Sequence, residues 1–424
     1  MEGLKHEVDL KQVLVVHSRY RSALPSGENG VVDREVDLLR SGGLRVRLHE
    51  RHSDDIEAMS LAAKAALPAR VVWSPAERRR CRAAIREFRP DVVHVHNTFP
   101  MLSPSVLAAC SDEGVPVVMT LHNFRLACAN GMLLRDGAPC ELCVGRLPIA
   151  ALRYGCYRDS RAATLPVAAL IATHRLLRTH ARLVDRFLVL NRFTRDMAIR
   201  NGLPAERIVV KPNFVPDPGE VRMGPGQHVL FIGRLELAKG VDLLLDAWQA
   251  LPVNSSTLVL AGDGELRPEV EALARSRPDV RYLGQRSRAE CMQLMLKARA
   301  VIVPSRWYEN MPLTIVEAFA AGVGVVGPHH GAFPELIGND ERGLSFRAGD
   351  SAELGEALRK VTSDDALMTE LGERARSHYE QHYTAQRNLA ALREAYESAS
   401  YRREPRFGKA TGTRAAMTAH RGEP

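Results

Sequence analysis

Long hydrophobic runs and aromatic residues are both scarce in this chain of 424 residues. No apolar run reaches the roughly 18 residues that a membrane-spanning helix needs, and residues 1–11 are charged and polar, so we expect neither a membrane span nor a secretory signal. Aromatic residues make up 5% of the chain and do not alternate with basic ones, so we expect no nucleic-acid partner. These absences predict a cytoplasmic protein.

The composition is that of an ordinary globular protein, with 45% apolar and 25% charged residues. The length suits two domains, each with its own core. The net charge of +8 is unevenly spread: residues 135–200 hold twelve arginines against five acids, and residues 401–424 hold six basic residues against two acids. Both segments suit an anionic membrane surface, so peripheral contact at the inner face of the membrane is one expectation.

Two series of short apolar segments, many separated by helix-like segments, predict an α/β fold with two Rossmann-like, doubly wound parallel sheets facing each other across a cleft. The first series is 13–17, 44–49, 91–96, 115–121, 187–191 and 208–211, and the second is 228–233, 257–262, 280–283, 300–304, 323–327 and 343–346. A proline-rich segment at 212–219 indicates a hinge. We therefore expect domains at 1–211 and 212–377, a helix at 378–400 and a disordered basic tail at 401–424.

Two cations occupy a strand-to-helix junction in the second series. Gly233 ends an apolar strand, Arg234 and Lys239 follow, and a helix begins after Gly240. Cations there face a helix N-terminus, where free N–H groups already favour an anion, so the junction suits a diphosphate.

Two glutamates eight residues apart form the second motif. Pro312 suits the first turn of a helix, which places Glu309 on the entering loop and Glu317 inside the helix. Ionised carboxylates accept hydrogen bonds from vicinal hydroxyls, as in a ribose or a hexose. Each motif alone also fits an ordinary strand end or a solvated helix face, but the two in order predict a nucleotide-sugar site.

With these motifs the chain resembles the retaining glycosyltransferases of family 4, of the bacterial polysaccharide-biosynthesis type and GT-B architecture. The matching segments are 26–30, 120–123, Gly233 with Arg234, Lys239 with Gly240, 261–265, 309–317 and 331–335. The resemblance implies that Arg234 and Lys239 bind the donor diphosphate, Glu309 the donor sugar and Glu317 the ribose. It also implies that His122 lies beside the reacting centre, and that the helix at 378–400 crosses back onto the first domain.

Further site residues follow from position. Gly27, in a glycine-rich turn after the first strand, lets the backbone approach the donor closely. His122 follows the strand at 115–121, and we expect it to bind the donor sugar with a pKa near the working pH. We expect at most one of His94 and His96 to reach the pocket because side chains alternate along a strand, and His96 with Asn97 is a weaker acceptor-site prediction.

Two features bear on the donor phosphates. Relatives usually carry glycine where this chain has Pro312, which has no N–H, so contacts from that loop fall to Leu313 and Thr314. The chain has no Asp-x-Asp, a pattern that holds a divalent ion in many nucleotide-sugar enzymes of the other major architecture. We therefore expect metal-independent hexosyl transfer without a catalytic cofactor, in which Arg234 and Lys239 neutralise the developing charge.

Four of the seven cysteines cluster within the insertion expected at about 124–186: Cys128, Cys140, Cys143 and Cys156. Cys140 and Cys143 have the spacing of a zinc knuckle, and the flanking cysteines would complete a structural zinc site with no open position. Four reduced free thiols are the alternative.

The segment at 162–187 has an apolar start followed by four arginines. It fits an interfacial helix that guides a lipid-linked acceptor, or a core-packed helix with a basic outer face.

The function that these expectations favour is retaining transfer of a sugar from a nucleoside diphosphate sugar to a saccharide or lipid-linked saccharide, in surface polysaccharide or glycolipid biosynthesis. The resemblance implies front-face attack assisted by the leaving phosphate. The alternatives are a sugar phosphorylase, a nucleotide-sugar epimerase or a non-catalytic sugar-nucleotide-binding partner.

Overall fold

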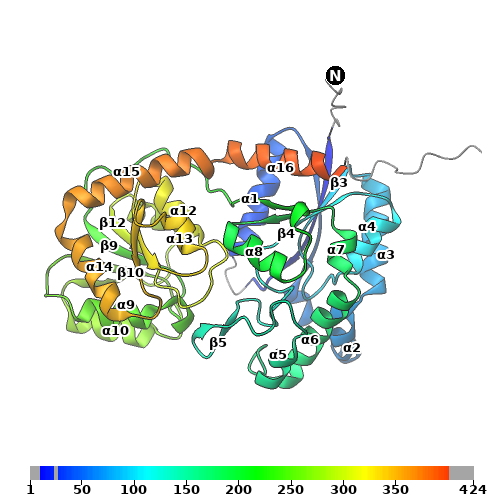
Figure 1. Cartoon of the computed structure of the whole chain (residues 1–424), viewed down its shortest axis with the longest axis horizontal. Coiled ribbons are helices and arrows are strands. Elements are labelled where there is room, and N and C mark those ends of the chain that lie inside the picture. Colours follow the sequence, from blue (N-terminus) through cyan, green and yellow to red (C-terminus); the bar gives the residue numbers. More distant parts are fainter. Residues whose placement is uncertain (1–9, 23–26, 401–424) are drawn as a thin grey trace, which may run out of the picture.

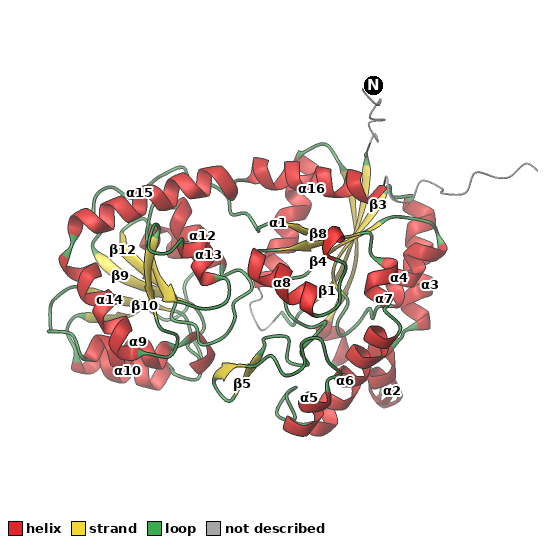
Figure 2. Ribbon diagram, viewed as in Figure 1, coloured by secondary structure: helices red, strands yellow, loops and turns green. Residues whose placement is uncertain are grey.

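The computed structural model describes residues 10–22 and 27–400 (Figure 1). The start of the glycine-rich turn, Ser26, and the basic tail at 401–424 lie outside the described residues. Two six-stranded parallel sheets form the centres of two halves, as Figure 2 shows in yellow, and this confirms the predicted fold class.

The first sheet has the strand order β2-β1-β3-β4-β7-β8. Its strands are β1 (Gln12–Arg19), β2 (Arg45–His52), β3 (Val92–Asn97), β4 (Val117–Thr120), β7 (Arg186–Val189) and β8 (Ile208–Val210). Val13 to Val16 have no exposed surface, because helices cover both faces of the sheet.

The second sheet has the order β11-β10-β9-β12-β13-β14. Its strands are β9 (His228–Ile232), β10 (Thr257–Ala261), β11 (Val280–Tyr282), β12 (Ala298–Ile302), β13 (Val325–Pro328) and β14 (Gly343–Phe346). All twelve predicted strands are present, although several begin or end a few residues from the predicted position.

Helices cover both sheets. Those of the first half are α1 (Gly27–Ser41), α2 (Leu61–Val72), α3 (Pro75–Phe88), α4 (Ser105–Asp112) and α8 (Arg192–Arg200), with 3₁₀ turns at Ser53–Ile56 and Ala205–Arg207. Those of the second half are α9 (Val241–Gln249), α10 (Arg267–Ser276), α11 (Arg288–Met295), α12 (Leu313–Ala320), α13 (Phe333–Ile337), α14 (Ser351–Ser363) and α15 (Asp365–His382), with a 3₁₀ turn at Leu237–Lys239.

The segment between β4 and β7 carries its own small elements. They are the hairpin β5 (Leu134–Arg135) and β6 (Ala138–Pro139), and the helices α5 (Ile149–Tyr154), α6 (Arg161–Leu176) and α7 (Thr179–Leu183). Figure 2 shows the hairpin standing apart from both large sheets. One face of α6, with Val167, Leu170 and Ile171, is buried in a small core, as the core-packed alternative predicted, whereas Leu165 on the same helix is 58% exposed.

The chain returns to the first half at its end. The predicted helix at 378–400 is observed as the last turn of α15 followed, after a break at residues 383–384, by α16 (Ala385–Ser400). Figure 1 shows α15 and α16 running along one side of both halves. Leu392, Ala395 and Tyr396 of α16 pack into the core of the first sheet. Among the helices of the described residues, none combines the length and apolarity needed to cross a bilayer.

Candidate active site

A cavity of about 640 Å³ lies between the two halves, at the carboxyl ends of the parallel strands. Its volume is in the range of small-molecule sites, about 300–1,000 Å³. The first half contributes Gly27, Glu28, His122, Asn123 and Arg125 to its wall, and the second half contributes Arg234, Lys239, Glu309, Leu313 and Thr314. Most of the predicted donor residues therefore meet in one cavity.

Two glycines set the shape of the loop that carries the cations. A Cβ on Gly240, at φ +69°, would lie 1.9 Å from the carbonyl oxygen of Pro304. A Cβ on Gly262, at φ +147°, would lie 1.8 Å from that of Gly233. Only glycine fits either position, so the loops after β9, β10 and β12 pack closely and fix Lys239 beside the loop that follows β12.

Glu309 accepts three side-chain hydrogen bonds at the wall of the cavity. Its Oε1 accepts from Lys239 Nζ at 2.5 Å, from Ser305 Oγ at 2.8 Å and from Trp307 Nε1 at 3.0 Å. The residue is only 5% exposed. Since all three bonds go to Oε1, Oε2 is the oxygen available to a ligand hydroxyl.

Arg234 lies on the rim of the same cavity. Its Nη1 donates to Glu236 Oε1 at 2.6 Å, and its side chain is 56% exposed. Exposed ion pairs of this kind contribute little, about 0–1 kcal/mol, so the guanidinium can exchange Glu236 for a ligand phosphate at small cost.

The N-terminus of α12 completes this wall of the cavity. Leu313 and Thr314 are its first two residues and line the cavity, and Pro312 before them is the N-cap. The first N–H groups of a helix have no partner within it, so they suit a phosphate. This arrangement is compatible with the predicted phosphate contacts.

Glu317 and Gly233 do not line the cavity. Glu317 lies about 6 Å further along α12 than Leu313, at 1.5 Å per residue, and Arg288 Nη2 donates to its Oε1 at 3.0 Å. Burial raises the pKa of Glu317, while Arg288 and Arg34 lower it. Contact with a ribose would require Glu317 to exchange Arg288 for the sugar.

The loop that carries Glu309 is bonded to the strand end that carries His122. Asn310 Nδ2 donates to the carbonyl oxygen of Leu121 at 2.8 Å. Asn310 also accepts bonds from the side chains of Asn191 and Thr194. These contacts fix the two sides of the cavity relative to each other.

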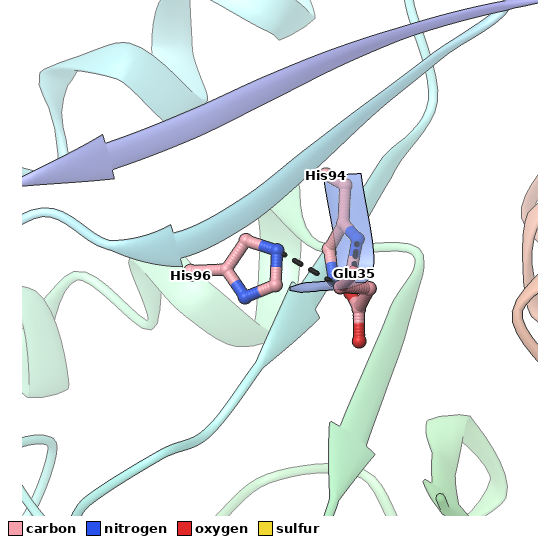
Figure 3. Close-up of side chains that lie close together, drawn as sticks. All are labelled: Glu35, His94 and His96. Atoms are coloured by element: carbon pink, nitrogen blue, oxygen red, sulfur yellow. Dashed lines mark ion pairs between the residues drawn. The ribbon is translucent and has the colours of Figure 1, made fainter. Parts of the chain in front are cut away.

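A chain of buried groups lies behind His122, and Figure 3 shows its members Glu35, His94 and His96. His96 Nδ1 is 2.8 Å from His122 Nε2, and His96 Nε2 is 3.5 Å from Glu35 Oε1. Because a carboxylate only accepts, we place the proton of His96 on Nε2; its Nδ1 then accepts from His122. His122 Nδ1 is left as an acceptor for a sugar hydroxyl.

The predicted pKa of His122 near the working pH is wrong. Burial lowers the pKa of His122 well below its usual value, and His17, Lys211 and His94 lower it further. His122 is therefore neutral at neutral pH, so it offers hydrogen bonds rather than a positive charge to the cavity.

His94 and His96 lie on the same face of β3, because side chains two residues apart point the same way. Their ring centroids are 4.1 Å apart. The predicted alternation of His94 and His96 across the strand is therefore wrong, although only His96 reaches a cavity wall. His94 is held deeper by Tyr396 Oη and Thr120 Oγ1, each at 2.8 Å.

Glu35, His94 and His96 form the one group in the described part of the chain whose potential ligand atoms all lie within 4.8 Å of one another. Lys211 Nζ, however, is 2.5 Å from Glu35 Oε2, and both nitrogens of His94 are hydrogen-bonded. Lys211 already supplies the positive charge that a metal would bring, so we interpret this group as a hydrogen-bond network.

A second cavity of about 410 Å³ lies on the first half, and His122, Asn123, Arg125 and Phe99 border both cavities. The predicted acceptor residues His96 and Asn97 line it. The amide of Asn97 is already engaged, because Nδ2 donates to the Ser18 carbonyl at 3.3 Å and Oδ1 accepts from the N–H of Phe99 at 2.9 Å. Asn97 thus shapes this cavity rather than offering free polar atoms.

Glu28 is a site residue that the sequence reasoning missed. Its Oε2 lies 3.1 Å from Asn123 Nδ2 and 3.4 Å from Tyr20 Oη, and its Oε1 is buried with no partner among the described residues. Burial raises the pKa of Glu28 to about 7. The only sequence signal was an acidic residue in the first turn after the first strand. The sequence does not show that the carboxyl group of this residue is buried.

Comparisons with known proteins agree with this architecture. Residues 31–217 match the family model described as Glycosyltransferase Family 4, and residues 223–378 match the one described as Glycosyl transferases group 1. Glycogen synthase of Mycobacterium tuberculosis is 28% identical over 74% of this chain and 70% of its own length. Phosphatidyl-myo-inositol mannosyltransferase of Mycobacterium leprae is 26% identical over 82% of this chain and 87% of its own.

Solved structures share the fold. Anabaena HepE in complex with UDP superposes with a TM-score of 0.61 at 18% identity, covering 92% of this chain and all of that one. Sucrose-phosphate synthase from Thermosynechococcus elongatus superposes with a TM-score of 0.65 at 15% identity, covering 91% of this chain and 98% of that one.

Proposed function

We propose retaining transfer of a sugar from a nucleoside diphosphate sugar to a hydroxyl acceptor, because this chain belongs to the family 4 glycosyltransferases of GT-B architecture. The observation that carries the proposal is the contact between Lys239 and Glu309 at 2.5 Å, in a cavity whose opposite wall holds His122. The neighbour HepE, solved with UDP and with UDP-glucose, supports a nucleotide-sugar donor.

In the proposed donor complex, the diphosphate lies between Lys239, Arg234 and the N-terminus of α12. These groups stabilise the negative charge that grows on the leaving phosphate, and they do so without reorganising because the loops already hold them. Glu309 accepts a hydrogen bond from a hydroxyl of the donor sugar through Oε2, and neutral His122 does so through Nδ1. Divalent cations are not required in this proposal.

The transfer step balances without a co-reactant. The bond between the anomeric carbon and the phosphate oxygen breaks, and the acceptor oxygen bonds to that carbon on the same face. The acceptor proton passes to the leaving phosphate, so the configuration is retained. The oxocarbenium-like transition state lies between the phosphate and the two sugar-binding residues.

The proposed acceptor is a saccharide or a lipid-linked saccharide. The 410 Å³ cavity, which meets the donor cavity at His122, supports an acceptor entering from the first half. Apolar side chains on and before α5 support a lipid link, since Ile149 is 70% exposed and Leu147 is 42% exposed beside Arg146 and Arg153. The mannosyltransferase relative is named for phosphatidyl-myo-inositol, and this also supports a lipid-linked acceptor.

The test is a panel of nucleotide sugars assayed for nucleotide release with and without saccharide and lipid-linked acceptors. We expect release to depend on an acceptor, and we expect NMR of the product to show the donor's anomeric configuration. An inverted product would refute the retaining step. Release driven by phosphate alone, or isomerised donor without transfer, would indicate a phosphorylase or an epimerase, and binding without turnover a non-catalytic partner.

A further inference from the structure

Four cysteines that the proposed reaction does not use surround one small cavity in the segment between β4 and β7. Cys128, Cys140, Cys143 and Cys156 all line this cavity, whose volume is about 20 Å³. They come from three places in the chain: the loop after β4, the turn after β6 and the turn after α5. The fold therefore gathers four thiols that lie up to 28 residues apart in the sequence.

Local backbone bonds shape the turn that carries Cys140 and Cys143. The N–H of Cys140 donates to the Leu133 carbonyl at 2.7 Å, which sets the first cysteine at the end of the hairpin. The N–H of Val144 donates to Glu141 at 3.0 Å and that of Arg146 to Cys143 at 3.2 Å, and Gly145 adopts φ +71°. Two cysteines on such a tight turn present both sulfurs to one side, as in a zinc knuckle.

Four thiols share the wall of one small cavity. Four thiolates in this space would repel one another, and a divalent ion removes that repulsion. Arg135 lines the same cavity, and its guanidinium pairs with Asp136 Oδ2 at 2.5 Å.

We propose that Cys128, Cys140, Cys143 and Cys156 bind one structural Zn²⁺ as a tetrathiolate site. A set of four sulfur donors selects zinc or iron. The cavity of about 20 Å³ suits a single ion rather than an iron–sulfur cluster. No three of the sulfurs lie within 4.8 Å of one another in the described structure, so binding draws them inward.

The site would hold one wall of the donor cavity. Asn130 and Gly131 closely follow Cys128, Tyr157 and Arg158 follow Cys156, and all four residues line the 640 Å³ cavity. Four thiolates leave no open coordination position, so this zinc takes no part in the chemistry. The ion would connect the loop after β4 with the turn after α5. Neither segment belongs to a large sheet, and both contain residues that line the donor cavity.

The test is the metal content of the full-length protein, purified from zinc-supplemented cells without an affinity metal column. We expect about one zinc per chain by mass spectrometry of the elements, since one tetrahedral ion uses all four thiolates. We expect the double variant Cys140→Ser/Cys143→Ser to lose it. Cys291→Ser, which alters a cysteine on α11 outside the cluster, is the matched control and keeps its zinc.

Substitution of the site with Co²⁺ provides a second readout that does not depend on the variants folding. We expect the absorption bands of tetrahedral thiolate cobalt in the wild-type protein. Wild-type protein that carries less than a tenth of the expected zinc and whose four thiols all react with a thiol reagent would overturn the proposal, and so would iron in place of zinc. Metal content and cobalt spectra are measured without a sugar substrate, so they stand apart from the test of the proposed function.

Discussion

Glu309 combines burial, charge and three hydrogen bonds in a single residue of the cavity. We predict that Glu309→Gln keeps the fold, because the amide has the same shape, but lowers kcat/KM about 10²-fold or more, the usual loss when a charged contact made in the transition state is removed. Steady-state kinetics with the preferred donor measure this. The control is Glu269→Gln, an exposed carboxyl on α10; equal losses in both variants would contradict the assignment.

Glu28 makes stability depend on pH. Its pKa in the folded protein is about 7, above its usual 4.5, so the native state holds the extra proton between these values. Stability must therefore fall as the pH rises from about 4.5 to 7, and the full penalty is present above 7. At 1.36 kcal/mol per unit of pKa shift, this penalty is at most about 3 to 4 kcal/mol.

We predict that Glu28→Gln raises the melting temperature relative to wild type at pH 8 and changes it little at pH 4. We also expect the wild-type rate profile to bend near pH 7, and the variant profile to lose that bend. Thermal unfolding and initial rates across this pH range test both points. A variant destabilised equally at every pH would show that the carboxyl is not buried in the way described.

Among single residues, the sequence indicated the charged residues that meet in the cavity but not their partners. Lys239, Glu309, Leu313 and Thr314 were found because each follows a strand or opens a helix. The neutral protonation state of His122 was not predictable, because the groups that lower its pKa come from three other strands or their ends. Glu28 was overlooked for the same reason, since Asn123 and Tyr20 meet it only in the fold.

Among the elements, the loop before α12 connects the two halves through Asn310. We predict that Asn310→Ala lowers stability by about 1–3 kcal/mol, the cost of leaving buried polar partners unsatisfied. We also expect kcat/KM to fall, because Glu309 and His122 lose their fixed separation. Chemical denaturation and kinetics measure the two effects, and Gln249→Ala, an exposed change on α9, is the control.

Unchanged turnover in Asn310→Ala would mean that the two walls of the cavity are set by other contacts.

Helix α5 and the loop before it present apolar and basic side chains to solvent. We predict that the wild-type protein sediments with vesicles of anionic lipid and that Ile149→Asp reduces the bound fraction several-fold, because it removes an apolar side chain and adds a repelled charge. Val253→Asp, at an exposed apolar residue of the second half, is the matched control. Equal binding by both variants would refute membrane contact through α5.

The strands were predictable because apolar runs of four to eight residues between breakers have few other interpretations. The hairpin β5–β6 and α5 were not, since two-residue strands and a six-residue helix show no periodicity. The break between α15 and α16 was also missed. It lies at residues 383–384, where Tyr383 is buried against the second half while α16 packs on the first.

At the scale of the whole molecule, two sheets facing each other gather cations from one half and the histidine and Glu28 from the other. No single stretch of sequence contains this site. The motif from Gly233 to Gly240 and the motif from Glu309 to Glu317 therefore had to be interpreted together. The alternation of strands and helices predicted the cleft, because parallel sheets bind ligands at the carboxyl ends of their strands. Contacts such as that of Asn310 with Leu121 depend on how the halves meet, and no pattern predicts them.

In the proposed reaction, fixed protein cations stabilise the departing nucleoside diphosphate. The most direct measurement is the rate of sugar transfer in buffer with a chelator of divalent cations, comparing wild type with Lys239→Ala and with Lys297→Ala, an exposed lysine of the second half. We predict full turnover for wild type and Lys297→Ala, and a kcat lower by about 10²- to 10³-fold for Lys239→Ala. Turnover by Lys239→Ala at the wild-type rate, or wild-type turnover only when a divalent cation is supplied, would contradict the claim.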